Sequence, residues 1–131
     1  MYFSANALAR KMEKLAAKSW AGADISPSHA YLLMIVIEEP GVQPGALAGE
    51  MLLKASTVTR FIEKLEEKKL VVRTNAGKIT NVYPTPKAKQ MLPKLKICLD
   101  NFFSAYSKIL GREESLKLLR SMHKLADKLP G

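Results

Sequence analysis

The stretch KASTVTRFIEKLEEKKLVVR, residues 54–73, constrains the fold most, because the pattern of its apolar residues changes within it. Its first part places apolar side chains at helical spacing, at Val58, Ile62 and Leu65. After Leu70 the residues are β-branched, and a second such run, ITNVYPT, follows a tight-turn pattern at residues 75–78. The stretch therefore predicts a helix that leads directly into a two-stranded hairpin.

Two more helices are predicted immediately before this one. Ser26 is a natural N-cap, Pro27 suits the first helical position, and Pro40-Gly41 ends a segment that is apolar almost all round. That helix should be the buried one. A short helix follows over residues 44–51, and Ser56 is expected to cap the third helix of the trio.

Long amphipathic helices are predicted at both ends of the chain. Apolar residues recur at helical spacing over residues 3–19, and Thr85-Pro86 is a hydroxyl cap followed by proline. The helix that starts there should end at Gly111, and Pro93 within it predicts a kink or a restart. A last helix is expected from Arg112 to about Lys128.

The order of elements predicts a fold that is mainly α with a small β-hairpin. Three helices followed by a hairpin form a winged helix-turn-helix, here with helices added at both chain ends. We expect a single domain over residues 1–131, with the winged helix-turn-helix in residues 26–85 and the added helices in residues 1–19 and 86–131.

The charge of the chain suggests an anionic partner, either nucleic acid or a membrane surface. The formal net charge is +9, and residues 43–92 hold nine basic and four acidic residues, a net of +5. The longest apolar run, residues 30–37, is far shorter than the ~20 residues that span a bilayer. With charges throughout its first 18 residues the chain also has no signal-peptide pattern, so we expect a cytoplasmic protein.

The front of the helix within residues 54–73 carries the clearest functional signal. In a helix-turn-helix the second helix enters the major groove N-terminus first, where short polar side chains permit close approach. Ser56, Thr57 and Thr59 meet that need, and Arg60 supplies a guanidinium that can bridge two acceptors of guanine. This end is therefore predicted to face DNA, although a helix cap and a solvated charged surface are the simpler interpretations of the same residues.

Further DNA contacts are predicted around this helix. Lys78 at the hairpin tip, between Asn75 and Thr80, can reach a minor groove or a phosphate. Sequence-independent phosphate contacts are expected from four residues: Gln43, Lys54, Lys64 and Arg73.

Residues 47–73 resemble the MarR (multiple antibiotic resistance regulator) family of transcription factors. The segment LAGEMLLKASTVTRFIEKLEEKKLVVR follows the family's Leu-Ala-x-x-Leu, Ser-Thr-Val-Thr-Arg and Leu-Val-x-Arg patterns. Two positions depart from it: Lys69 stands where the family commonly has glycine, and the wing has Lys78 instead of an Asp-x-Arg motif.

The resemblance implies a regulator, with a repressor favoured, that binds a pseudo-palindromic operator as a homodimer through its terminal helices. It also implies release from DNA by a small aromatic or anionic effector. Trp20, His29, Tyr31 and Phe102 are candidates to line that effector site, although plain core or interface residues are the more common role for such side chains.

Other classes of function have little support in the sequence. No nucleophile-base arrangement, glycine-rich phosphate loop or metal-ligand spacing is present, so no enzyme, cofactor or metal site is expected. Cys98, the only cysteine, is expected in the core between Ile97 and Leu99, with a redox-sensing thiol as the alternative. The main alternative function is a winged helix that binds a protein and not specific DNA.

Overall fold

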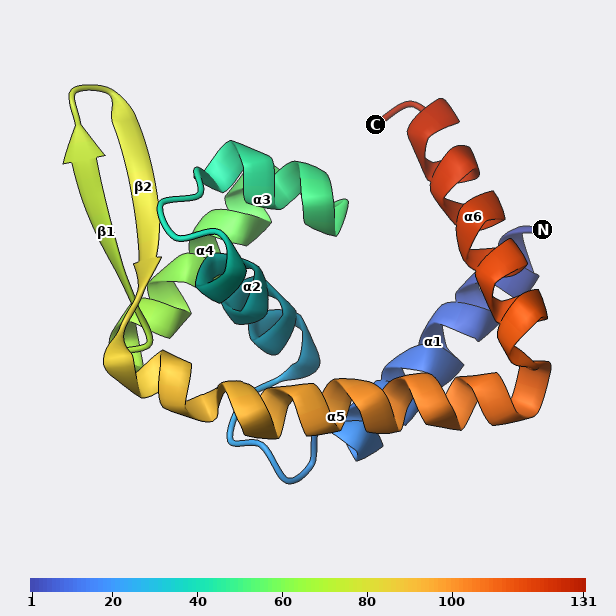
Figure 1. Ribbon diagram of the computed structural model, residues 1–131. Coiled ribbons are helices and arrows are strands. Elements are labelled where there is room, and N and C mark those ends of the chain that lie inside the picture. Colours follow the sequence, from blue (N-terminus) through green and yellow to red (C-terminus); the bar gives the residue numbers. More distant parts are fainter.

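The computed structural model describes residues 1–131, which form six helices and one two-stranded sheet (Figure 1). The elements in chain order are α1 (Tyr2–Ser19), α2 (Pro27–Glu38), α3 (Pro44–Met51), α4 (Ala55–Glu67), β1 (Val71–Ala76), β2 (Ile79–Pro84), α5 (Pro86–Leu110) and α6 (Arg112–Lys128). The predicted order of elements and the mainly α fold class are confirmed.

The hairpin is longer, and its turn tighter, than the sequence suggested. β1 and β2 pair antiparallel along their whole length, and Ala76 pairs with Ile79 across a turn of Gly77 and Lys78 alone. Asn75 and Ala76, predicted to lie in the turn, extend β1 instead. Gly77 has a φ of 65°, which its missing side chain permits, so a two-residue turn closes the hairpin and the prediction of a four-residue turn was wrong.

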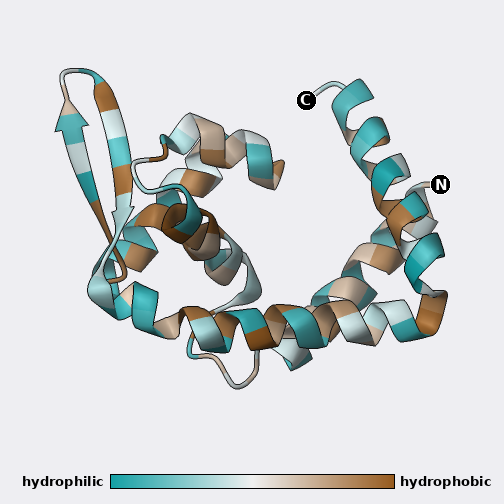
Figure 2. Cartoon of the chain, viewed as in Figure 1, coloured by the Kyte–Doolittle hydropathy of each residue, from teal (hydrophilic) through white to brown (hydrophobic).

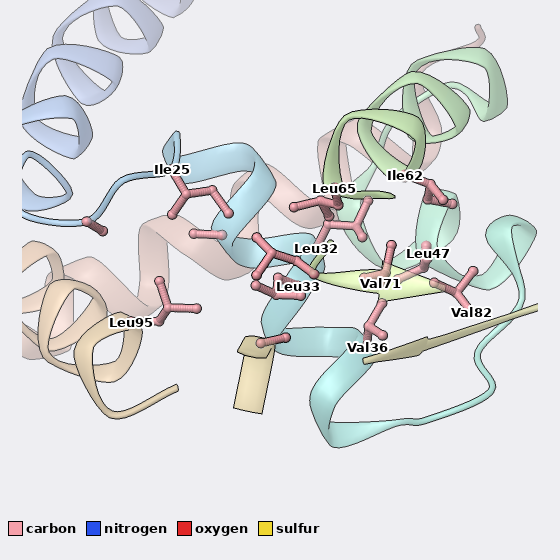
Figure 3. Close-up of a cluster of buried hydrophobic side chains, with 14 of the residues drawn as sticks. Ile25, Leu32, Leu33, Val36, Leu47, Ile62, Leu65, Val71, Val82 and Leu95 are labelled. Atoms are coloured by element: carbon pink, nitrogen blue, oxygen red, sulfur yellow. The ribbon is translucent and has the colours of Figure 1, made fainter. Parts of the chain in front are cut away.

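The core lies where α2 meets α3, α4 and the hairpin (Figure 3). As predicted, α2 is the buried helix, because Leu32, Leu33 and Val36 are fully inaccessible. Side chains from the surrounding elements close over them: Leu47, Ile62, Leu65, Val71, Val82 and Leu95. Cys98 also belongs to this core, in agreement with its expected packing role.

Hydroxyl caps start two of the helices as predicted. The Ser26 hydroxyl accepts a hydrogen bond from the His29 amide at 3.4 Å, and the Thr85 hydroxyl accepts one from the Ala88 amide at 3.3 Å. The capping role predicted for Ser56 is wrong. Since α4 already begins at Ala55, Lys54 occupies the N-cap position and Ser56 is the second helical residue.

The end of α4 is tied to the start of α5 by polar contacts. Lys69 adopts a φ of 61°, the left-handed conformation in which glycine is usual after a helix. The Thr85 hydroxyl donates to the Lys69 carbonyl at 2.8 Å, and Lys87 Nζ donates to the Lys68 carbonyl at 3.0 Å. These contacts fix the direction in which α5 leaves the winged helix.

α5 runs from the hairpin past α1 to α6, so it joins the winged helix to the terminal helices (Figure 1). It passes Pro93 as one continuous helix, without the restart that the sequence left open. Along α1, α5 and α6 hydrophobic residues alternate with hydrophilic ones (Figure 2), and many of the former are exposed. None of the six helices combines the length and the hydropathy needed to cross a membrane.

Candidate nucleic-acid interface

The first turn of α4 is open to the surroundings, while the opposite side of the helix is buried. Val58, Ile62 and Leu65 anchor α4 to the core, and Ser56 and Arg60 are exposed on the other side. No side chain caps the helix, and the Thr57 amide donates to the Lys54 carbonyl, so the amides of Ala55 and Ser56 remain available to an acceptor. Such amides and the positive end of the helix dipole favour an anion, such as a phosphate.

The three hydroxyl residues of this turn differ in what their side chains can still bind. The Thr59 hydroxyl donates to the Ala55 carbonyl at 3.0 Å, so its proton is already used within the helix. The Thr57 hydroxyl accepts from Arg60 Nη2 at 3.5 Å, whereas the Ser56 hydroxyl caps no amide. Ser56 is therefore the hydroxyl best placed to bind an external group.

Arg60 combines exposure with partial orientation. Its hydrogen bond to Thr57 draws the guanidinium back along the helix toward the N-terminus. No carboxylate lies within ion-pair distance of it, in contrast to Lys64, whose Nζ is 3.8 Å from Glu67 Oε2. The charge and the remaining donors of Arg60 are therefore free for a partner at the front of α4.

Three other predicted contact residues are exposed on different elements. Lys54 stands at the N-cap position of α4, and Gln43 at that of α3, and both side chains are exposed. Lys78 is exposed in the hairpin turn, where Asn75 and Thr80 hydrogen-bond to each other at 2.9 Å. Gln43, Lys54 and Lys78 are thus all exposed, on α3, α4 and the wing.

Arg73 is the predicted contact whose environment differs most from expectation. Its Nη2 atom lies 2.7 Å from Glu66 Oε1, and both side chains are about one third exposed. The pair links β1 to the last turns of α4, so Arg73 orients the wing relative to the helix. Its charge is largely balanced, which makes it a weaker phosphate ligand than Lys78.

We expect a double-mutant cycle of Glu66→Gln and Arg73→Gln, measured by urea unfolding, to give a coupling free energy of at most about 1 kcal/mol, because the pair is partly solvated. Glu66→Gln alone should strengthen binding to DNA, since it frees the Arg73 charge. Weaker DNA binding by Glu66→Gln would show that the orientation of the wing matters more than the freed charge.

Three acidic residues gather where α2 ends and α3 passes it. Glu38 and Glu39 at the end of α2 lie near Glu50 of α3, whose pKa is raised by desolvation, by a hydrogen bond with Glu39 and by repulsion from both neighbours. A polyanion is disfavoured over this cluster. This end of α2 and α3 is therefore not expected to contact DNA.

The predicted effector residues separate into two places. Trp20 packs against Tyr31 and Phe102, with ring centroids 5.4 and 5.7 Å apart, and Phe102 in turn contacts Tyr106 at 5.2 Å. We call these four residues the aromatic cluster. Burial raises the pKa of both tyrosines, and the Tyr106 side chain adds to the rise at Tyr31.

A buried donor in the aromatic cluster has no partner. Trp20 is 2% exposed, and its indole Nε1–H has no acceptor within the chain. A buried donor left without a hydrogen bond costs about 1–3 kcal/mol. Because Nε1 is fully buried, an acceptor can reach it only when the surrounding side chains move apart.

His29 lies apart from the aromatic cluster, in the plain structural role that the sequence predicted as the more common one. Its ring packs on Phe61 of α4 with centroids 4.5 Å apart, and its Nδ1 hydrogen-bonds to the Ser26 hydroxyl. Burial, followed by the nearby charges of Lys68 and Lys64, lowers the pKa of His29. His29 is a structural residue of the contact between α2 and α4.

The lowered pKa of His29 predicts a loss of stability in mild acid. The His29 ring binds a proton more tightly in the unfolded chain than in the folded one. The contribution of neutral His29 to the free energy of unfolding is therefore complete above about pH 6.5, and it is lost as the pH falls through the pKa of His29 in the folded protein. We expect urea midpoints measured between about pH 7.5 and 5.5 to fall more for the wild type than for His29→Gln. If the urea midpoints of both proteins fall equally with pH, His29 is not the cause of the loss of stability.

Three residues of these sites were missed in the sequence. Glu66 and Tyr106 were not among the predicted site residues. Ile79 received no role, although it is 49% exposed beside the wing tip. The one sequence signal for Ile79 is that a β-branched apolar residue directly follows the Gly77-Lys78 turn.

A sequence model of the MarR family matches residues 23–78, the segment that runs from just before α2 through the helix-turn-helix to the wing tip. This segment of the chain is similar to the MarR family. The predicted family resemblance is thereby confirmed, and the match extends beyond the residues that first carried it. A segment of this type agrees with the expectation that the chain is not an enzyme. No curated protein matches the sequence significantly.

Solved structures of MarR-type regulators share the whole fold. Bordetella bronchiseptica BpsR, whose DNA binding is regulated by 6-hydroxynicotinic acid, superposes with a TM-score of 0.87 at 11% identity, over 98% of this chain and 94% of its own. S. aureus MepR in complex with DNA superposes with a TM-score of 0.81 at 17% identity, over 98% of both chains. CouR from Rhodococcus jostii RHA1 bound to p-coumaroyl-CoA superposes with a TM-score of 0.82 at 18% identity, over 98% of this chain and 93% of its own. At these identities the likeness concerns the fold.

Proposed function

We propose that this protein is a MarR-type, sequence-specific DNA-binding repressor that places the front of α4 in the major groove. The observation that carries the proposal is the first turn of α4, where Ser56 and Arg60 are exposed beside uncapped backbone amides. Arg60 reads a base pair, the amides bind a phosphate, and Lys54 and Lys78 add salt-dependent attraction. Residues 26–85 form the DNA-binding part.

The regulator acts as a homodimer through residues 1–19 and 86–131. Support comes from the apolar side chains that α6 exposes: Leu116, Leu118, Leu119, Met122 and Leu125 are each 39–44% accessible. Ser115 is the only buried residue of this 17-residue helix, so α6 gains little from packing within its own chain. A two-fold dimer would read a pseudo-palindrome with half-sites about 10 bp apart.

The aromatic cluster is the proposed effector site. It lies between α1, α2 and α5, so a molecule that enters there would change how α2 sits on α5 and hence how α4 meets DNA. Aromatic rings bind flat aromatic ligands by stacking, and Trp20 Nε1 offers them a hydrogen bond. Because Trp20 is the only tryptophan, its fluorescence reports binding directly.

The effector proposal is tested with 6-hydroxynicotinic acid and p-coumaroyl-CoA, the molecules associated with BpsR and CouR. We expect at least one to change Trp20 fluorescence saturably and to weaken DNA binding. Trp20→Phe should raise the concentration needed for DNA release, because it removes the indole donor but keeps an aromatic ring. Release that is unaffected by Trp20→Phe would place the effector elsewhere.

The DNA-binding proposal is tested by fluorescence anisotropy on the DNA upstream of the protein's own coding region, at two salt concentrations and with scrambled competitor. Tight binding that resists competitor supports a sequence-specific regulator. Weak binding that is equal for every sequence and abolished by salt would contradict it. The alternative, a winged helix that binds a protein, would then become the leading interpretation.

A further inference from the structure

The wing tip presents an apolar side chain next to its lysine. Ile79 is 49% exposed and directly follows Lys78, and on the other strand it faces Ala76. Gly77 completes the turn. The tip therefore offers one positive charge and one bulky aliphatic group, with no acidic residue beside them.

The register of the hairpin explains why Ile79 stays outside the core. Residues paired across the strands share a face, so Arg73, which forms the ion pair to α4, lies on the same face as the buried Val82. The opposite face carries Val72, Thr74, Ala76, Ile79, Asn81 and Tyr83, and none of these is charged. Ile79 is the most distal large member of that outer face.

The wing is built to hold its tip in a defined position. Its strands of six residues each, at ~3.3 Å per residue, extend about 20 Å. Only Val71 of β1 is buried, so most of the hairpin stands clear of the helices, as Figure 1 shows. The Asn75–Thr80 side-chain hydrogen bond at 2.9 Å adds a link one pair below the tip.

We propose that Ile79 is an apolar minor-groove contact that packs against the sugars and the edge of a base step while Lys78 binds the adjacent phosphate. This inference rests on the proposed DNA-binding function. With the front of α4 in the major groove, the wing reaches the flanking minor groove, where aliphatic side chains act as wedges that open base steps. Flexible steps such as TA and CA open most easily, so Ile79 would favour them in the flanks.

Two substitutions with matched geometry separate this role from general effects on the hairpin. Ile79→Thr removes the aliphatic end but keeps the β-branch that suits a strand. Val72→Thr makes the corresponding change on the same outer face, at the base of the hairpin, and Val72 is 48% exposed against 49% for Ile79. Lys78→Ala serves as the electrostatic comparison.

The experiment measures anisotropy over a series of salt concentrations, on a site that the wild type binds specifically. Ile79→Thr should weaken binding about tenfold at every salt concentration, which corresponds to about 1.4 kcal/mol. Its slope of log affinity against log salt should not change, because an apolar contact releases no counterions. Lys78→Ala should reduce that slope by about 0.9 for each wing that binds.

The outcomes distinguish failure of this inference from failure of the proposed function. The role of Ile79 is overturned if Ile79→Thr binds a specific site as tightly as the wild type does. It is also overturned if Val72→Thr weakens binding as much as Ile79→Thr does. In both cases the proposed DNA-binding function stays intact. If wild-type protein binds no DNA sequence in preference to another, the proposed function fails first. Selection from random flanks gives a second readout, since enrichment of TA and CA steps by the wild type should disappear with Ile79→Thr.

Discussion

Arg60→Lys should remove most of the discrimination between an operator and unrelated DNA, while binding to unrelated DNA changes little. Lysine keeps the positive charge but lacks the planar fork that contacts two guanine acceptors at once. One such contact accounts for ~1–3 kcal/mol, so the ratio of specific to non-specific affinity should fall about tenfold or more. Competition anisotropy with operator and scrambled duplexes measures this ratio.

Lys78→Ala is the comparison for this experiment, since a phosphate contact carries no sequence information. It should weaken operator and scrambled DNA by similar factors. An Arg60→Lys protein that discriminates as well as the wild type would show that α4 does not read bases through Arg60. The docking proposed for this helix would then be wrong.

Leu119→Glu should convert the protein to a monomer and weaken operator binding by about a hundredfold or more, because the second half-site would no longer be tethered. Leu119 is 44% exposed on α6, within the apolar stripe that we assign to the dimer interface. A carboxylate placed there would be buried without a partner on association. Sedimentation velocity measures the assembly, and anisotropy measures the affinity.

Lys124→Glu is the control, because five residues further along a helix lie about 140° around its axis. The residues three and four positions from Lys124 are all polar (Arg120, Ser121, Asp127 and Lys128), so a carboxylate on this exposed side of α6 should leave the dimer intact. A dimeric Leu119→Glu protein would contradict the role assigned to α6.

Helix boundaries were predictable where a local rule decides them. The pairs Ser26-Pro27 and Thr85-Pro86 combine a hydroxyl cap with a proline at the first helical position, and both helices begin there. Gly111, with a φ of 92°, ends α5 as glycine is expected to do. Ser56 is not a cap because it is the second residue of the helix. Lys54 occupies the N-cap position, and its side chain makes no capping hydrogen bond.

The partners of the site residues could not be predicted in the same way. Whether Arg73 meets Glu66 or a phosphate depends on the angle between the hairpin and α4, which no local pattern determines. The place of His29 depends on which side of α2 packs against Phe61 of α4. The front of α4 was predictable because its exposure follows from the buried positions of the same helix.

Selection of binding sites from a random duplex pool tests the central claim most directly, because the operator sequence emerges from the selection itself. The wild-type protein should enrich a pseudo-palindrome with half-sites about 10 bp apart, and Arg60→Lys should lose a guanine from each half-site. A pool that shows no enrichment after several rounds, although the protein is folded and dimeric, would contradict the claim that α4 reads DNA.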